Sequence, residues 1–75
     1  MVTFNISLNS IDNVKNFVNL VCKYDFDVDL TSGRYVVDAK SIMGIFSLDL
    51  AKPILLEAHT DDASIKDDMK DFLAK

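Results

Sequence analysis

The sequence predicts an α+β fold in which one sheet of four strands carries helices on one face. Two periodicities support this prediction: apolar residues recur at every second position in several short segments and with helical spacing in others. The expected order is strand, helix, strand, strand, helix, strand, helix. Each expected strand has one apolar face and each long helix one apolar stripe, so a single sheet covered on one side would bury all of them.

The first strand is expected at residues 2–8, and the first helix begins near residue 11. The strand alternates polar side chains with apolar ones, which are Val2, Phe4, Ile6 and Leu8. The helix has its apolar residues at the spacing i, i+3, i+4 and i+7, namely Val14, Phe17, Val18 and Val21. Ser10 or Asp12 is expected to cap this helix at its N-terminus.

A second strand is expected at residues 26–30 and a third at residues 34–37, joined by a hairpin at Ser32-Gly33. The polar side of the second strand carries three carboxylates, those of Asp25, Asp27 and Asp29. We interpret them as a solvated face rather than a metal site. Side chains two apart on a strand point the same way, whereas a divalent cation needs ligands that converge from several directions.

Ser41 stands directly before a short run that is apolar on nearly every side, and it is expected to cap a second helix. A helix that only covers a core needs one apolar stripe, so some side chains of this run are expected to form a surface patch. Gly44 within the run costs about 1 kcal/mol relative to alanine. This cost favours close approach of another backbone at Gly44. Pro53 is expected to end the helix.

A fourth strand is expected at residues 54–59, followed by a last helix with Asp61 and Asp62 at its start, where carboxylates suit the helix dipole. The apolar stripe of this helix consists of Ile65, Met69, Phe72 and Leu73. Cys22 is the only cysteine, so an internal disulfide is excluded. We expect Cys22 to be an unreactive boundary residue beside the stripe of the first helix.

Composition and charge exclude several classes of function. A chain of 75 residues predicts one small domain over residues 1–75. The net charge is −4 and no Lys or Arg cluster is present, so nucleic-acid binding is not expected. No apolar run approaches the ~18 residues of a membrane span, and no cationic, apolar leader is present. The expectation is a cytoplasmic monomer without membrane contact.

The segment Lys40-Ser41-Ile42-Met43-Gly44-Ile45, followed by Ser47-Leu48, resembles the regulatory-serine helix of HPr, the phosphocarrier of the bacterial sugar phosphotransferase system. Residues 23–30 and 50–52 resemble HPr as well. The resemblance implies an HPr-like open-faced β-sandwich of order βαββαβα. Its four-stranded antiparallel sheet has three helices on one face, and the fourth strand lies between the first and second.

The phosphocarrier loop of the HPr family, Gly-X-His-Ala-Arg-Pro, has no counterpart in this sequence. A count back from Ser41 without gaps places Asp12 at the arginine and Asn13 at the proline, and the histidine position is either deleted or occupied by Ser10. A carboxylate repels a phosphoryl group that the arginine would stabilise. We therefore expect no phosphoryl transfer by the usual route. His59, the only histidine, is expected to be solvated at the opposite end of the sheet.

Ser41 retains its setting, and the resemblance implies that it is a regulatory phosphorylation site. Lys40, Ile42, Met43 and Phe46 are the expected partner-binding residues. HPr kinase/phosphorylase and other phosphotransferase-system proteins are the expected partners. The expected roles are regulation of sugar transport and carbon catabolite repression. The alternative is an unphosphorylated interaction module, a decoy or adaptor, that uses the Ile42/Met43/Phe46 surface. Catalytic residues, metal ligands and cofactors are not expected, because no nucleophile–base pair, ligand cluster or Gly-rich phosphate loop is present.

Overall fold

The computed structural model describes residues 1–74, and its elements follow the predicted order. They are β1 (Val2–Ile6), α1 (Ile11–Val21), β2 (Val28–Ser32), β3 (Tyr35–Asp38), α2 (Ile42–Phe46), β4 (Ile54–Ala58), α3 (Ile65–Asp68) and a 3-10 helix, η1 (Lys70–Phe72). Within these residues, no helix has the length and apolar character that a membrane span requires.

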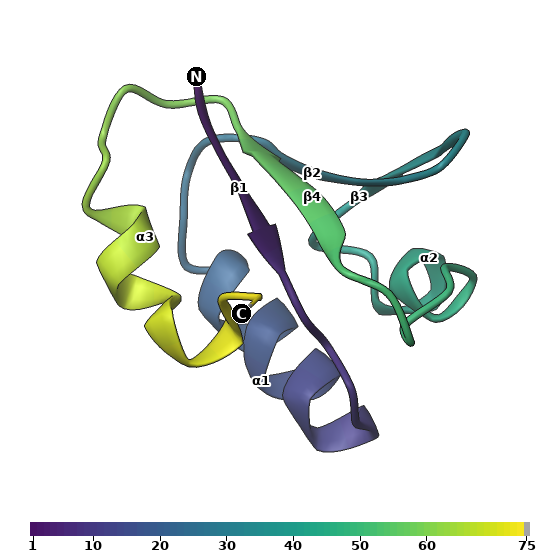
Figure 1. Ribbon diagram of the computed structural model, residues 1–75. Helices are drawn as coiled ribbons and strands as arrows, with labels where there is room; N and C mark the ends of the chain where they lie inside the picture. Colours follow the sequence, from purple (N-terminus) through teal and green to yellow (C-terminus); the bar gives the residue numbers. More distant parts are fainter. Residues whose placement is uncertain (75) are drawn as a thin grey trace.

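The four strands form one antiparallel sheet in the order β1-β4-β2-β3 (Figure 1). The strand β4 lies between β1 and β2, as the resemblance to HPr implied. Val2 of β1 lies opposite Ala58 of β4, and Ala58 in turn lies opposite Val28 of β2. The prediction of a four-stranded antiparallel sheet in an open-faced α+β fold is therefore confirmed.

The core lies between the sheet and the helices. Val14, Phe17 and Val21 of α1 are fully buried, as the helical spacing predicted, and Phe17 meets Phe72 edge-on with ring centroids 5.7 Å apart. The strands contribute the apolar residues of one sheet face, Ile6, Val28, Leu30, Ile54, Leu56 and Ala58. Because this face is covered and the other is not, the sheet has one open side.

The second strand begins at Val28, two residues later than the alternation predicted. Phe26 lies before the strand, where its ring stacks on Tyr24 with centroids 4.8 Å apart. Of the three carboxylates expected on the polar side of this strand, only Asp29 belongs to β2. The apolar–polar alternation therefore extends beyond the strand itself, because Phe26 is apolar for its packing on another ring and not for strand pairing.

The helix α2 is much shorter than Pro53 suggested, since it ends at Phe46. Its C-cap, Ser47, donates its hydroxyl proton to the Gly44 carbonyl, and its backbone N–H reaches the same carbonyl. Asp49 then accepts a bond from the Ala51 N–H (3.1 Å). These local bonds turn the chain before the proline is reached.

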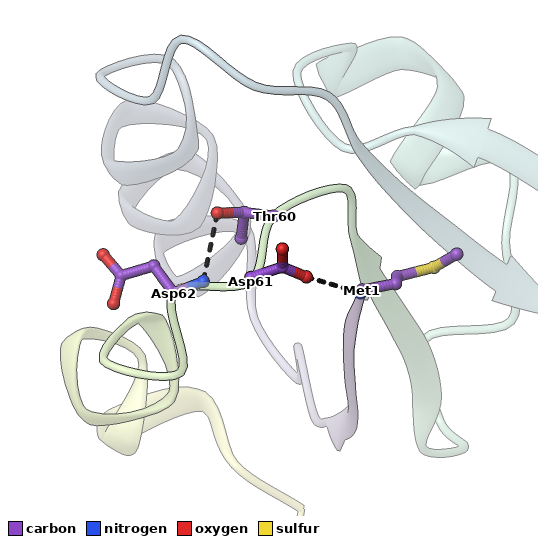
Figure 2. A network of polar contacts seen from close by, with 4 residues as sticks. All are labelled: Met1, Thr60, Asp61 and Asp62. Carbon is purple, nitrogen blue, oxygen red and sulfur yellow. Dashed lines mark hydrogen bonds and ion pairs between the residues drawn. The ribbon is translucent and has the colours of Figure 1, made fainter.

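The last helix begins at Ile65, so the prediction that Asp61 and Asp62 start it is wrong. Asp62 instead accepts bonds from the Ser64 hydroxyl (2.7 Å) and backbone N–H (3.0 Å), and these bonds lower its pKa. Asp61 lies 3.4 Å from the amino group of Met1 (Figure 2). Both carboxylates belong to the turn that precedes α3, where Asp side chains commonly bond nearby backbone.

Candidate functional site

The hydroxyl of Ser41 is exposed at the start of α2, where the sequence predicted it. Ser41 has extended backbone angles, and its Oγ accepts a bond from the Gly44 N–H (3.2 Å). Its own backbone N–H donates to the Asp38 carbonyl at the end of β3 (3.0 Å). The strand therefore sets the position of the serine, and the cap leaves the hydroxyl oxygen at the surface.

Gly44 allows two side chains to approach the backbone of α2. A Cβ at this position would lie 3.3 Å from Ser41 Oγ and 3.3 Å from the Cβ of Val37 in β3. The sequence suggested close approach of another backbone here, but the neighbours are side chains. The glycine therefore places the serine hydroxyl and α2 close to the edge strand.

Lys40 is held by the chain itself. Its Nζ donates to the Tyr24 carbonyl (3.0 Å) in a partly buried bond. Tyr24 in turn donates its hydroxyl proton to Asp68 of α3 (2.9 Å). Burial, followed by this bond to a carboxylate, raises the pKa of Tyr24 to about 12. The ammonium of Lys40 thus stabilises the loop after α1, and its role in partner binding stays a prediction.

The predicted apolar patch is present on α2. Met43 is 77% exposed and Phe46 41% exposed, whereas Ile42 is half-buried against the core. The ring of Phe46 lines an open groove of about 400 Å³ between α2 and the start of α1. The other residues that line this groove are Asn9, Ser10, Ile11, Leu50 and Ala51.

Ile11, Leu50 and Ala51 were not predicted as part of this surface. Ile11 is 62% exposed although it lies in the first turn of α1. Ile11 lies three residues before Val14, so helical spacing places it on the side of the apolar stripe, and its exposure has no local sequence signal. The opposition of α1 and α2 depends on tertiary packing and has no local sequence signal.

The loop between β1 and α1 is closed by its own polar side chains. Ser10 caps α1, since its Oγ accepts a bond from the Asn13 N–H (3.1 Å). The Asn13 amide donates to Asn9 Oδ1 (2.7 Å), and Asp12 is exposed in the first turn. The capping role proposed for Ser10 is thus confirmed. The loop contains no imidazole that can accept a phosphoryl group.

A second, polar pocket of about 340 Å³ opens beside this loop. Its lining consists of Ser7, Asn9, Asn13, Asp71 and Leu73. The carboxylate of Asp71 lines this pocket, and Asp71 forms no ion pair within residues 1–74. Such a surface does not favour a phosphoryl group.

His59 lies at the other end of the sheet. It directly follows Ala58, which lies opposite Val2 at the start of β1. The loop with Ser10 follows Ile6 at the other end of β1. Its Nε2 lies 2.9 Å from Asp29 Oδ2, and both side chains are partly open to solvent. In the described part of the chain, no group of three or more residues is placed to hold a metal ion.

Residues 13–74 match the family described as "PTS HPr component phosphorylation site". The chain belongs to the HPr family. The HPr match starts at Asn13, so it includes Ser41 and all of α2 but not the loop around Ser10. Members of the HPr family are phosphocarrier proteins of the phosphotransferase system, not enzymes.

The fold comparison agrees with this assignment to the HPr family. A crystal structure of HPr-C-His from Thermoanaerobacter tengcongensis is 30% identical in sequence and superimposes with a TM-score of 0.72. The match covers 91% of this chain and 86% of that HPr chain. No match is found among curated proteins. The family model thus covers α2, α3, β2, β3, β4 and most of α1, and it leaves out β1 and the loop around Ser10.

Proposed function

We propose that this member of the HPr family does not carry phosphoryl groups and instead regulates the phosphotransferase system through phosphorylation of Ser41. The loop that holds the acceptor histidine in relatives has Asn9, Ser10 and Asp12 here. Ser41, by contrast, keeps an exposed hydroxyl at the head of α2. The observation that carries the proposal is this hydroxyl, which caps the helix that carries the exposed side chains of Met43 and Phe46.

Phosphorylation would change the surface around Ser41 without entering the core. A phosphate adds about −1.5 to −2 charges and three strong acceptor oxygens. An arginine of a partner protein can bind such a group with two parallel hydrogen bonds. Met43 and Phe46 would supply adjacent apolar contact, so a partner would recognise the phosphate and the patch together.

Incubation with ATP and the HPr kinase of a Gram-positive bacterium is expected to add one phosphate to the protein, at Ser41. The exposed hydroxyl and its position before α2 are the physical reasons for this expectation. Intact mass spectrometry measures the gain, and fragmentation assigns the residue. The Ser41→Ala variant is expected to gain no phosphate.

The Ser10→Ala variant is the matched control, because Ser10 caps α1 through the same contact that Ser41 makes at α2. Each substitution removes one cap and costs about 1 kcal/mol. Ser10→Ala should therefore have similar stability but full phosphorylation. If the wild-type protein gains no phosphate while HPr from the kinase's own organism does, the proposal is wrong.

The groove beside Phe46 favours a second candidate function, a module that binds an unmodified partner such as enzyme I. Its apolar lining is open without any modification of Ser41. Phe46→Ala is then expected to weaken binding of enzyme I about tenfold, as for a buried aromatic anchor. Isothermal titration calorimetry with unphosphorylated protein measures the change. Val36→Ala, at an exposed apolar position on β3 outside the groove, should bind as the wild type does.

A further inference from the structure

The two edges of the sheet differ in how they are covered. At the β1 edge, the Ser7 N–H donates to the Phe72 carbonyl (2.7 Å), and the Ala74 N–H donates to the Asn5 carbonyl (3.1 Å). Ile6 and Leu73 also form a bridge there. At the other edge, β3 pairs only with β2. The β2–β3 hairpin extends away from α1 and α3 (Figure 1). An open strand edge is a template for pairing with another chain.

The outer backbone groups of β3 can be identified from one hydrogen bond. The Ala39 N–H donates to the Val28 carbonyl of β2 (2.9 Å). Backbone groups alternate between the two sides of a strand, so residues 35, 37 and 39 face β2, and Val36 and Asp38 face outward. The Asp38 carbonyl accepts a bond from the Ser41 N–H. The free edge therefore presents both polar groups of Val36 and the N–H of Asp38.

The side chains on this edge are unusually apolar for an open strand. Tyr35 is 69% exposed and Val36 is 64% exposed. Exposed edges in monomeric proteins are commonly protected by lysine, proline or a bulge. Neither proline nor lysine occurs within β3, and its register with β2 runs without a bulge from Tyr35 to Asp38.

Charges on either side of Val36 are complementary to those of a second copy. Asp38 ends β3, and Arg34 lies in the turn directly before this strand, although the sequence predicted the strand to start at Arg34. Arg34 and Asp38 are equally distant from Val36 in the sequence. If two β3 strands pair antiparallel about Val36, then the turn residue Arg34 of each copy lies at the end of the pair where Asp38 of the other copy ends its strand. Val36 exchanges its N–H and C=O bonds with Val36 of the second copy. Neither Arg34 nor Asp38 takes part in an ion pair within residues 1–74.

We propose that two copies of this protein associate through their β3 edges in an antiparallel pair centred on Val36. The pairing joins two four-stranded sheets into one continuous sheet with two-fold symmetry, the usual symmetry of homodimers. This inference departs from the expectation of a strict monomer, and it does not depend on phosphorylation of Ser41. The contact is small, so the association is weak and reversible.

Sedimentation velocity over a wide range of concentrations tests the dimer directly. We expect a dissociation constant on the order of 0.1 mM, so the weight-average mass should rise from one chain at about 10 µM toward two chains at about 1 mM. The buffer should contain about 0.15 M salt, which screens the net charge of −4 on each chain. A mass of one chain across this range overturns the proposal.

A charge exchange tests the register. Arg34→Asp places two carboxylates opposite each other at each end of the pair, and Asp38→Arg places two guanidinium groups there. Each variant alone is expected to dimerise at least tenfold more weakly than the wild type. An equimolar mixture of the two restores opposite charges at both ends, so it should form a heterodimer about as strong as the wild-type dimer. Dimers of unchanged strength for each variant alone overturn the proposal.

Asp38→Arg in the charge exchange also removes the bond from the Lys40 N–H to the Asp38 carboxylate, so circular dichroism must check that this variant folds. Val36→Pro provides a separate test that leaves both charges in place. The N–H of Val36 faces away from β2, so proline there removes no bond of the monomer. We expect a folded protein that sediments as one chain at about 1 mM. A Val36→Pro dimer of wild-type strength shows that association uses another surface and overturns the proposal.

Discussion

Replacement of Phe17 by alanine is expected to lower the free energy of unfolding by about 3–5 kcal/mol. Phe17 is fully buried and contacts the ring of Phe72, so its removal leaves a cavity between α1 and the C-terminal segment. A domain of 75 residues has a total stability of about 4–11 kcal/mol. The loss is therefore a large part of the whole. Urea denaturation followed by circular dichroism measures it.

Phe46→Ala is the matched control for this prediction. The same atoms are removed, but the ring of Phe46 is 41% exposed and lines a groove that solvent already enters. We expect a loss below about 1.5 kcal/mol, because less apolar surface returns to water and no closed cavity forms. Equal losses for Phe17→Ala and Phe46→Ala would contradict the packing described for α1.

Ionisation of Tyr24 is expected only near pH 12. Burial disfavours the phenolate first, and the bond to the carboxylate of Asp68 adds to the effect. Because the pKa in the folded state lies above the ordinary value of about 10, Tyr24 stabilises the fold fully below pH ~10. This stabilisation is lost as the pH rises toward 12. Near-UV absorbance in a Tyr35→Phe background isolates the titration of Tyr24.

Asp68→Asn removes the charge but keeps an oxygen that can accept the hydroxyl proton of Tyr24. The pKa of Tyr24 should then fall part of the way from about 12, because burial continues to raise it. Asp67→Asn is the control, since the same change one residue earlier has no bond to Tyr24 in the structure. An unchanged pKa in Asp68→Asn would show that the contact between the loop and α3 does not form in solution.

The periodicity of the sequence located the interiors of the strands and of α1 correctly, but it located several boundaries poorly. Val14, Phe17 and Val21 are buried as predicted, because the apolar stripe of a long surface helix is buried against the core. The alternation placed Phe26 in the second strand, but Phe26 lies before that strand and stacks on Tyr24. Asp62 was expected at the start of the last helix, but it bonds Ser64 in the turn before that helix. Side-chain bonds of this kind compete with regular structure and are invisible to periodicity.

The candidate site was predictable in its local parts only. The Ser41 cap, the exposure of Met43 and Phe46, and the loop without histidine follow from neighbouring residues in the sequence. The bond from Lys40 to the Tyr24 carbonyl and the groove between Ile11 and Phe46 join segments far apart in the chain. Nothing in the local pattern encodes such contacts, because they arise when the helices pack on the sheet.

The central position of β4 has a consequence for the newly made chain. The strand β1 is synthesised first, but its partner lies 56 residues later, counted from Val2 to Ala58. A ribosome adds about 5–20 residues per second, so β1 waits roughly 3–11 s for its partner strand. Until then, the β2–β3 hairpin and the helices α1 and α2 are the elements that can form from local contacts. During that interval the apolar face of β1 is open to chaperones and to other nascent chains.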